Sequence, residues 1–156
     1  MFLSNEIPPL CIGLARRALD EMTELAGGTS RLPGGATLGE RAVFHKELGR
    51  AETKVRAARL VHRDAVSMAW QAALAGDPPS PDVHAAVTAA SIFAVETSAE
   101  VIADLFRYGG GRMLSLSSPM QRYLRNALGA RQHIGVSEEF YENAGRQRIQ
   151  SAMSGR

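Results

Sequence analysis

The stretch HAAVTAASIFAVETSAEVIADLF, residues 84–106, decides the fold of this chain. Small and apolar side chains occupy nearly every side of the helix that these residues would form. That composition is typical of a helix buried between neighbours, whereas a surface helix keeps one polar face. We therefore predict that this segment is the central helix of the molecule, with Phe93 and Phe106 in the core.

Both ends of this helix carry sequence signals. Ser80 is a good N-cap, and Pro81 suits the first helical position, where its missing N–H costs nothing. At the other end, three consecutive glycines at 109–111 break the helix. We expect the helix to extend from Pro81 to about Tyr108.

Other segments show helical periodicity, and none alternates as a β-strand would. The predicted long helices are residues 9–26, residues 37–74 and residues 118 to beyond His133. The last two open on capping boxes, at Thr37–Glu40 and Ser118–Gln121, and a weaker helical segment follows at about 138–152. Trp70, near the end of the second helix, is predicted to be buried. Four long helices with short connections indicate an all-α, up-and-down four-helix bundle that forms one domain over residues 1–156.

Length and composition exclude several classes of protein. A chain of 156 residues with 45% hydrophobic residues can bury a core unaided, and it has no stretch apolar enough to span a membrane. Its first nine residues lack the basic leader and apolar core of a signal peptide. Cys11 is the only cysteine, so neither an internal disulfide nor a thiolate zinc cluster can form. We expect a cytoplasmic protein with no membrane partner.

Positive charge is unevenly distributed along the chain. The formal net charge is only +2, yet residues 105–137 contain five arginines and no acidic residue. Arginine suits bidentate contacts to phosphate or carboxylate. Because so small a net charge does not favour binding to nucleic acid, we predict no nucleic-acid partner.

No set of metal ligands is visible in the sequence. A di-iron bundle needs Glu-x-x-His pairs on two helices, and none of the four histidines has an acid at that spacing. The H-E-x-x-H zinc motif is also missing. We therefore predict no metal site.

Three acids of the central helix share one face, namely Glu96, Glu100 and Asp104. We expect them to pair with arginines of the second helix, which are Arg56, Arg59 and Arg63. Such an interhelical ladder of ion pairs is favoured over a pair of catalytic carboxylates.

The fourth predicted helix has a polar side with small residues in its middle. At about 100° per residue, Arg122, Asn126, Gly129, Ala130 and His133 fall along that side. Two interpretations stay open. The side could receive a flat ligand, with the arginine as anion contact and the histidine as proton donor or acceptor. Alternatively it is a solvated face with a helix-packing glycine, which the spacing alone favours.

Four segments together carry a resemblance to a known family. They are IGLARRALDEMTELA (12–26), LGRAETKVRAARLVHRDAVSMAW (48–70), AVETSAEVIADLFRYGGG (94–111) and SPMQRYLRNALGARQH (118–133). Their order and spacing resemble the C-terminal helical domain of the acyl-CoA dehydrogenase superfamily. The last segment is most similar to the branch that contains two-component flavin-dependent monooxygenases.

The resemblance implies a cofactor, an assembly and a set of site residues. It implies FAD or FMN, held in part by Gly109, Gly110, Gln121 and Arg122, with His133 as the catalytic residue that faces the reactive flavin. It also implies a homo-oligomer, a dimer or a tetramer with the bundle at its core. The sequence departs from the branch after Arg125, where Asn126 stands in place of the usual aspartate.

A second activity within the same superfamily would use another residue. Acyl-CoA dehydrogenases take a proton from the substrate with a carboxylate, which in many members lies in a Tyr-Glu-Gly-Thr segment. Residues 141–144 read Tyr-Glu-Asn-Ala and lack the Gly-Thr. Glu142 is therefore the runner-up catalytic base, and otherwise an exposed helix glutamate.

Members of the superfamily normally carry an N-terminal helical domain and a β-barrel before this bundle, and we expect this chain to lack both. By the resemblance, those parts hold much of the flavin and the substrate. We therefore expect the isolated chain to bind flavin poorly and to need a separate β-barrel or N-terminal subunit and a flavin reductase. The alternative is a non-catalytic helical assembly module.

Overall fold

The computed structural model describes residues 6–28 and 35–154, and these contain five α-helices, three short 3₁₀ turns and no strand. The helices are α1 (Ile7–Ala26), α2 (Ala42–Leu74), α3 (Pro81–Gly109), α4 (Pro119–Ala130) and α5 (Glu139–Ser154). The turns are η1 (Leu38–Glu40), η2 (Gly110–Leu114) and η3 (Ile134–Val136). The predicted all-α class is confirmed.

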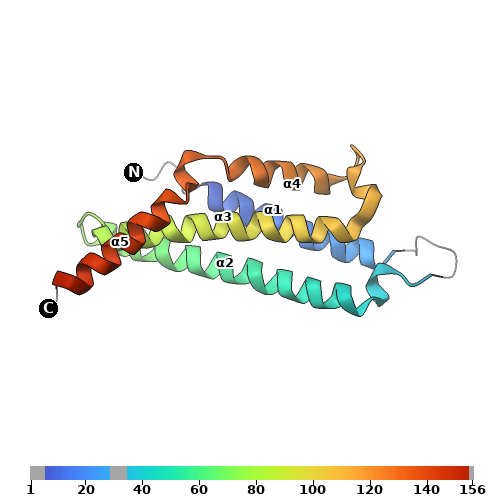
Figure 1. Cartoon of the computed structure of the whole chain (residues 1–156), viewed down its shortest axis with the longest axis horizontal. Coiled ribbons are helices and arrows are strands. Elements are labelled where there is room, and N and C mark those ends of the chain that lie inside the picture. The colour runs from blue at the N-terminus through green and yellow to red at the C-terminus, as the bar shows by residue number, and fades with distance from the viewer. Residues whose placement is uncertain (1–5, 29–34, 155–156) are drawn as a thin grey trace.

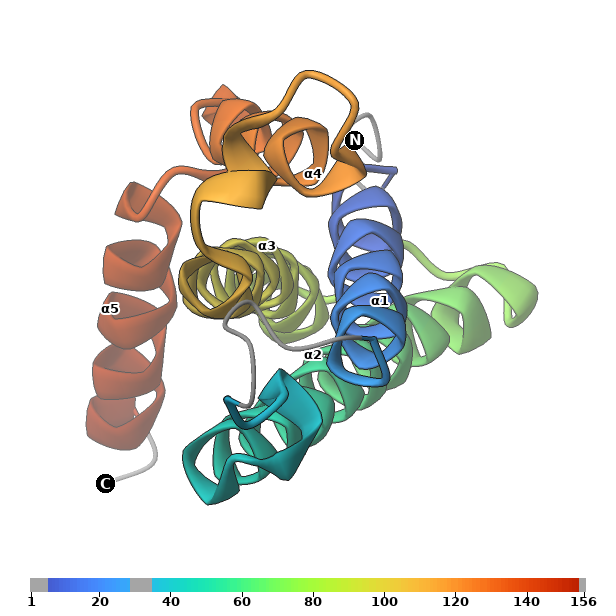
Figure 2. The ribbon, with the colours of Figure 1, turned by 90° about the vertical axis from the view of Figure 1, so that its right-hand side faces the viewer.

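Helices α1 to α4 run alternately in opposite directions, as an up-and-down bundle requires (Figure 1). Seen from the end, α3 lies in the middle, with α1, α2 and α4 around it (Figure 2). The fifth helix leaves the bundle after η3 and crosses it obliquely beside α3. The fold is therefore a four-helix bundle with one additional helix.

The sequence of α3 explains its central position. Its two ends are as predicted: the Ser80 hydroxyl accepts a hydrogen bond from the Val83 amide at 3.3 Å, and Gly110 follows with φ of 63°. Ser91 and Ser98 are buried and donate to the carbonyls four residues earlier, at 2.8 and 2.6 Å. The expectation that no stretch is apolar enough to span a membrane is wrong by length and composition, because the helix and the turn after it, Pro81–Leu114, are long and apolar enough to cross one. Most of this apolar window is buried within the chain. That is the pattern of a core helix.

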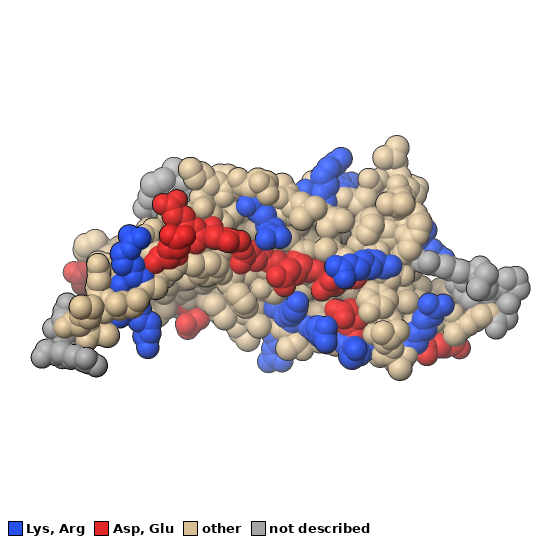
Figure 3. Space-filling model, in the orientation of Figure 1, with Lys and Arg blue, Asp and Glu red and all other residues tan. Residues whose placement is uncertain are grey.

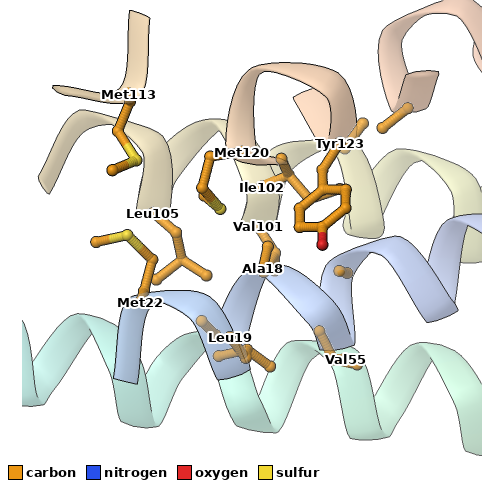
Figure 4. Packing of buried hydrophobic residues seen from close by; sticks show 14 of the residues in the cluster. Ala18, Leu19, Met22, Val55, Val101, Ile102, Leu105, Met113, Met120 and Tyr123 are labelled. Carbon is orange, nitrogen blue, oxygen red and sulfur yellow. The ribbon is translucent and has the colours of Figure 1, made fainter. Parts of the chain in front are cut away.

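The main core is formed by side chains from all four bundle helices (Figure 4). Ala18, Leu19 and Met22 of α1 pack against Ile102 and Leu105 of α3. Val55 of α2 and Met120 and Tyr123 of α4 close the cluster. Burial of each large side chain stabilises the fold by about 1.5–3 kcal/mol, so this cluster is the main source of stability.

A smaller apolar cluster attaches η3 and α5 to the bundle. It contains Cys11 of α1, Ile92 and Val95 of α3, and Val136 of η3. Phe140 of α5 packs against it from outside. The segment that follows α4 is therefore held against α1 and α3 by apolar contacts.

The second helix begins later than predicted. Its capping-box residues surround the short turn η1, where the Glu40 carboxylate accepts hydrogen bonds from the Thr37 amide at 2.7 Å and the Thr37 hydroxyl at 3.0 Å. Arg41 then adopts an extended conformation, and α2 starts at Ala42. The predicted hydrogen bonds between Thr37 and Glu40 do form, but they stabilise the 3₁₀ turn η1 that precedes α2.

Both boundaries of the fourth helix also differ from the prediction. The Ser118 side chain does not cap the helix; its hydroxyl lies 3.8 Å from the Met113 sulfur, while the Gln121 amide donates to the Ser115 carbonyl at 2.9 Å. The helix ends at Ala130 instead of continuing past His133, because the next amides form tighter i→i−3 bonds that close the last turn.

The predicted ladder between α2 and α3 does not form. Glu100 pairs with Lys54 of α2 at 3.3 Å, whereas Glu96 lies 4.0 Å from Arg131 and Asp104 lies 3.4 Å from Arg107 of its own helix. Acidic side chains form a band along the face that contains α3 (Figure 3). The three arginines at 56, 59 and 63 instead line a groove between α1 and α2, because α2 turns Ala65 and Ala69 toward α3.

Two of the three aromatic residues predicted to be buried are exposed. Trp70 is 62% exposed and Phe93 is 37% exposed, while Phe106 packs against the main core. Trp70 follows Ala69, which faces inward, and it therefore points outward.

Candidate functional site

The site residues predicted from the sequence lie in two groups at opposite ends of α4. Gly109, Gly110, Gln121 and Arg122 lie where α3 turns into α4, and His133 follows the far end of α4 (Figure 1). The 12 residues of α4 span about 18 Å at 1.5 Å per residue. A ligand that touched both groups would have to extend along the whole helix.

At the α3–α4 corner the two glycines are required by the geometry. A Cβ on Gly109 would clash with the buried side chain of Met113, whose sulfur would lie 2.5 Å away. Gly110 has φ of 63° and ψ of −157°, a conformation that L side chains rarely adopt. Both glycines therefore have a structural reason to be present, whether or not they contact a ligand.

The first turn of α4 has the chemistry of an anion site. The helix begins with Pro119 and has no side-chain cap, so its N-terminal amides and the positive end of its dipole are available. Arg112 and Arg122 are exposed nearby, and the Arg122 guanidinium carbon lies 5.9 Å from the centre of the Tyr123 ring. The Gln121 side chain is already bonded to the Ser115 carbonyl. The corner could accept a phosphate through Arg122 and the backbone.

At the other end of α4, His133 lines a cleft of about 650 Å³. The cleft lies between α3, the last turns of α4, η3 and the residue before α5. Its apolar wall is formed by Val95, Leu128, Ile134 and Val136. The cleft is therefore large enough for a small ligand and has both apolar and polar side chains in its lining.

The ring of His133 is fixed by a local hydrogen bond. Its Nδ1 accepts from the Gly135 amide at 3.0 Å, so the neutral ring carries its proton on Nε2. The side chain is exposed, and the residue precedes η3 in an extended conformation. This arrangement makes Nε2 a hydrogen-bond donor for whatever occupies the cleft.

Acidic groups lie at the α3 side of the same cleft. Glu96 of α3 and Glu138 both line it, with Arg131 4.0 Å from Glu96. Burial raises the pKa of Glu96, the neighbouring Glu138 raises it further, and Arg131 lowers it. Burial and the same two carboxyls raise the pKa of Tyr141 to about 12. This end of the cleft therefore favours a neutral or donor group over an anion.

The two ends of α4 thus suit different parts of a flavin. The apolar wall and the Nε2 donor of His133 suit an isoalloxazine ring, whose edge carries hydrogen-bond acceptors. A phosphate would be repelled by Glu96 and Glu138, whereas the α3–α4 corner attracts it. The residues present fit the cofactor by their chemistry.

The remaining predicted residues lie outside the cleft. Glu142 is exposed in the first turn of α5. Asn126 and Gly129 are exposed on α4, and a Cβ on Gly129 would meet nothing within 4 Å. No other described helix therefore packs against Gly129, so a helix-packing role within this chain is wrong.

Sequence reasoning missed the pairing of Glu96 with Arg131 and Glu138. The sequence predicts contacts of Glu96 with arginines of α2, because Glu96, Glu100 and Asp104 share one face of the central helix. Its early end at Ala130 and the turn around Gly135 fold the chain back onto α3. The turn-forming glycine at 135 was the available signal.

A second groove lies between α1 and α2, with a volume of about 980 Å³. His62 lines it and is only 8% exposed, and its Nε2 has no hydrogen-bond partner within residues 6–28 and 35–154. Burial lowers the pKa of this histidine. Sequence analysis did not single out His62.

Comparison with known proteins gives consistent results. Residues 7–138 match the family described as acyl-CoA dehydrogenase, C-terminal domain. An indole-3-acetate monooxygenase from Pseudomonas putida is 30% identical over 144 residues, which cover 92% of this chain but only 37% of that protein. The chain thus spans little more than a third of the length of this relative.

Solved structures show the same fold at lower sequence identity. XiaF from Streptomyces sp., in complex with FADH2 and glycerol, superposes with a TM-score of 0.86 at 18% identity, over 94% of this chain and 38% of XiaF. The HsaA monooxygenase from M. tuberculosis gives a TM-score of 0.82 at 22% identity, over 94% of this chain and 37% of HsaA. In each case the match covers this helical bundle and leaves most of the larger protein unmatched.

Proposed function

We propose, on the premise that the chain belongs to the family of acyl-CoA dehydrogenase C-terminal domains, that it is the C-terminal part of a flavin-dependent monooxygenase. The observation that carries this proposal is the cleft in which His133 stands against an apolar wall with its Nε2 as donor. The relative from Pseudomonas putida, an indole-3-acetate monooxygenase, supports this class of reaction, and the FADH2 bound in the XiaF structure supports a flavin as the cofactor.

In this proposal each group of residues has one task. The apolar wall of the cleft packs against the flavin ring and excludes water. His133 donates from Nε2 to the edge of the ring, and the Gly135 amide holds the imidazole in the tautomer that can do so. A reduced flavin supplies the activation of dioxygen when it is bound.

The α3–α4 corner takes the anionic part of the cofactor. Arg122 and the first-turn amides of α4 contact a phosphate, while Gly109 and Gly110 keep the turn compact. Gln121 positions the loop by its bond to the Ser115 carbonyl. FAD and FMN share this chemistry, and either satisfies the proposal.

The proposal requires further parts of an enzyme, because this chain covers 37% of its Pseudomonas relative. An N-terminal helical domain and a β-barrel would hold the rest of the flavin and the substrate. The partners are such a separate subunit, a flavin reductase and further copies of this chain in a homo-oligomer. A reducing, cytoplasmic location fits the single cysteine, which is free and buried.

Titration of the full chain with FMN and with FAD tests the proposal, with flavin fluorescence and calorimetry as readouts. We expect weak, saturable binding that His133→Ala and Arg122→Ala each weaken about tenfold, since each removes a polar contact worth about 1.4 kcal/mol or more. Glu142→Gln is the matched control, because Glu142 lies on α5 outside the cleft.

Two outcomes would contradict the proposal. Binding that Glu142→Gln weakens and His133→Ala leaves unchanged would favour a dehydrogenase with Glu142 as base. The absence of saturable binding for either flavin would leave the non-catalytic assembly module as the function of the chain.

A further inference from the structure

The groove between α1 and α2 carries three arginines that the proposed flavin site does not use. Arg56, Arg59 and Arg63 of α2 all line it. With Glu52 they form one stripe along the helix, because successive members are four, three and four residues apart. The groove shares no lining residue with the cleft of His133, so a ligand bound here would not occupy that cleft.

The positive charge of this stripe is not neutralised by the chain. None of the three arginines forms an ion pair within residues 6–28 and 35–154. Glu52 is the one acid that lines the groove, and its carboxylate lies 2.7 Å from the Arg16 guanidinium of α1. Beyond that pair the groove has three cations and no acid, and it therefore attracts an anion.

Apolar side chains lie beside the arginines. Ile12 of α1 and Val66 of α2 are partly buried in the lining, and Val55 is only 4% exposed. Leu60 also lines the groove and is 54% exposed. An apolar surface next to a row of cations suits a ligand that has an apolar body and an anionic head group.

A buried polar atom in the wall of the groove has no partner. His62 lines the groove and is only 8% exposed, and its Nε2 makes no hydrogen bond within the described parts of the chain. Buried polar atoms in folded proteins usually have a partner, because leaving one without costs free energy. In the tautomer that carries its proton on Nε2, the ring can donate to an acceptor atom of a ligand.

Gly13 leaves the α1 side of the groove open. It is exposed in the lining, and a Cβ at this position would meet nothing within 4 Å. Glycine is unfavourable inside a helix, and neither a close contact nor a positive φ requires it here. The missing side chain widens a groove of about 980 Å³, a volume in the range of small-molecule sites.

We propose that this groove binds a small amphiphilic anion, namely an apolar body with one carboxylate head group. The apolar body lies against Ile12 and Val55. The carboxylate lies beside Arg59 and His62, which are three residues apart and therefore share one side of α2. Arginine can hold a carboxylate through two parallel hydrogen bonds, and the ring supplies a third donor. The ligand contacts both α1 and α2, which lie side by side (Figure 2).

Calorimetry of the full chain with decanoate, below the concentration at which it forms micelles, tests the proposal. We expect saturable binding at one site. Decyltrimethylammonium and decanol have the same chain with a cationic and a neutral head group, and they are the matched ligand controls. Each should bind at least about tenfold more weakly than decanoate, because neither can pair with the arginines. Equal binding of all three would contradict the proposal.

Variants of the groove place the ligand. Arg59→Ala and His62→Leu should each raise the dissociation constant of decanoate about tenfold. Gly13→Leu should abolish binding, because the new side chain occupies the groove. Gly49→Leu and Arg50→Ala are the matched controls, since both positions lie on α2 outside the groove and a Cβ on Gly49 would also meet nothing within 4 Å. Urea unfolding confirms that each variant is folded.

Three outcomes would overturn the proposal. The first is no saturable binding of decanoate by the wild type. The second is binding that Arg59→Ala and Gly13→Leu leave unchanged, which would place the anion elsewhere. The third is sedimentation of the chain with phosphatidylglycerol vesicles without any binding of monomeric decanoate, which would make the arginine stripe a membrane contact. Each result is independent of the flavin titration, because the two sites have no residue in common.

Discussion

His62 shows how a single buried side chain ties stability to pH. Burial lowers its pKa, and its Nε2 has no partner among the described residues, so folding favours the neutral ring. The unfolded chain titrates near 6.5 and binds more protons below that pH. The free energy of unfolding should therefore fall as the pH decreases through 6.5 and below.

Thermal unfolding at pH 7.5 and pH 5 checks this prediction by circular dichroism. His62→Leu should reduce the fall in Tm on acidification, because the leucine cannot take up a proton. His84→Leu is the control, since His84 is exposed at the start of α3 and should leave the full fall in place. Equal falls in all three proteins would contradict the role of His62.

Two glycines with similar sequence contexts should respond in opposite ways to alanine. A Cβ on Gly39 would lie 2.6 Å from the Ala26 carbonyl oxygen, which is backbone and cannot move easily. Gly39→Ala should therefore destabilise the fold by about 1–3 kcal/mol. Gly49 lies exposed within α2 with nothing near its missing Cβ, and Gly49→Ala should stabilise the fold by about 0.5–1 kcal/mol.

Urea unfolding of the two variants measures these changes. The sequence could not distinguish the glycines, because only the packing of η1 against the end of α1 makes Gly39 necessary. A neutral or stabilising Gly39→Ala would show that η1 can move away from α1.

At the scale of elements, Glu96 lies where η3 packs against α3, and folding disfavours the ionised form of its carboxyl group. Burial and Glu138 raise the pKa of Glu96 above its usual value. The folded chain then binds more protons than the unfolded chain above about pH 4.5, so this group lowers stability as the pH rises through that window. Glu96→Gln should raise Tm at pH 7.5 and leave it nearly unchanged at pH 4.

Glu100→Gln serves as the control for that measurement. Glu100 is exposed and pairs with Lys54, so its replacement should change Tm little at either pH. A Glu96→Gln variant with a lower Tm at pH 7.5 would show that the contact with Arg131 outweighs the burial of the carboxylate.

Periodicity and punctuation predicted the helices well and their boundaries less well. The ends of α3 follow from local signals, namely Ser80 and Pro81 at the start and the glycines at 109–111 at the end. The end of α4 could not be read in the same way, because the apolar repeat continues beyond Ala130 while the backbone closes into a 3₁₀ turn. The capping box predicted at Ser118–Gln121 does not form, and the Gln121 side-chain amide instead donates a hydrogen bond to the Ser115 carbonyl.

At the scale of the whole molecule, the sequence did not predict which of the candidate residues lie together. Arg122 and His133 were assigned to one polar side of a long helix. The structure separates them to the two ends of a shorter one, and it brings Glu96 beside His133 instead. Contacts between distant segments depend on where each helix stops, which local patterns specify poorly.

The same reasoning explains the exposed Trp70. The simplest prediction for an aromatic residue in an amphipathic helix is a place in the core. In the last turns of α2 the packed face is formed by Ala65 and Ala69, so the larger Trp70 lies on the exposed side.

The buried thiol of Cys11 can report on local opening of the small apolar cluster around it. Burial raises the pKa of this thiol to about 11, and Val136 covers it from η3. Because the Cys11 side chain is fully buried, an alkylating reagent can reach the sulfur only when the packing around it opens, and detachment of η3 and α5 would be one such opening. The rate of modification therefore measures how often this packing opens, in a protein with no other thiol to confuse the signal.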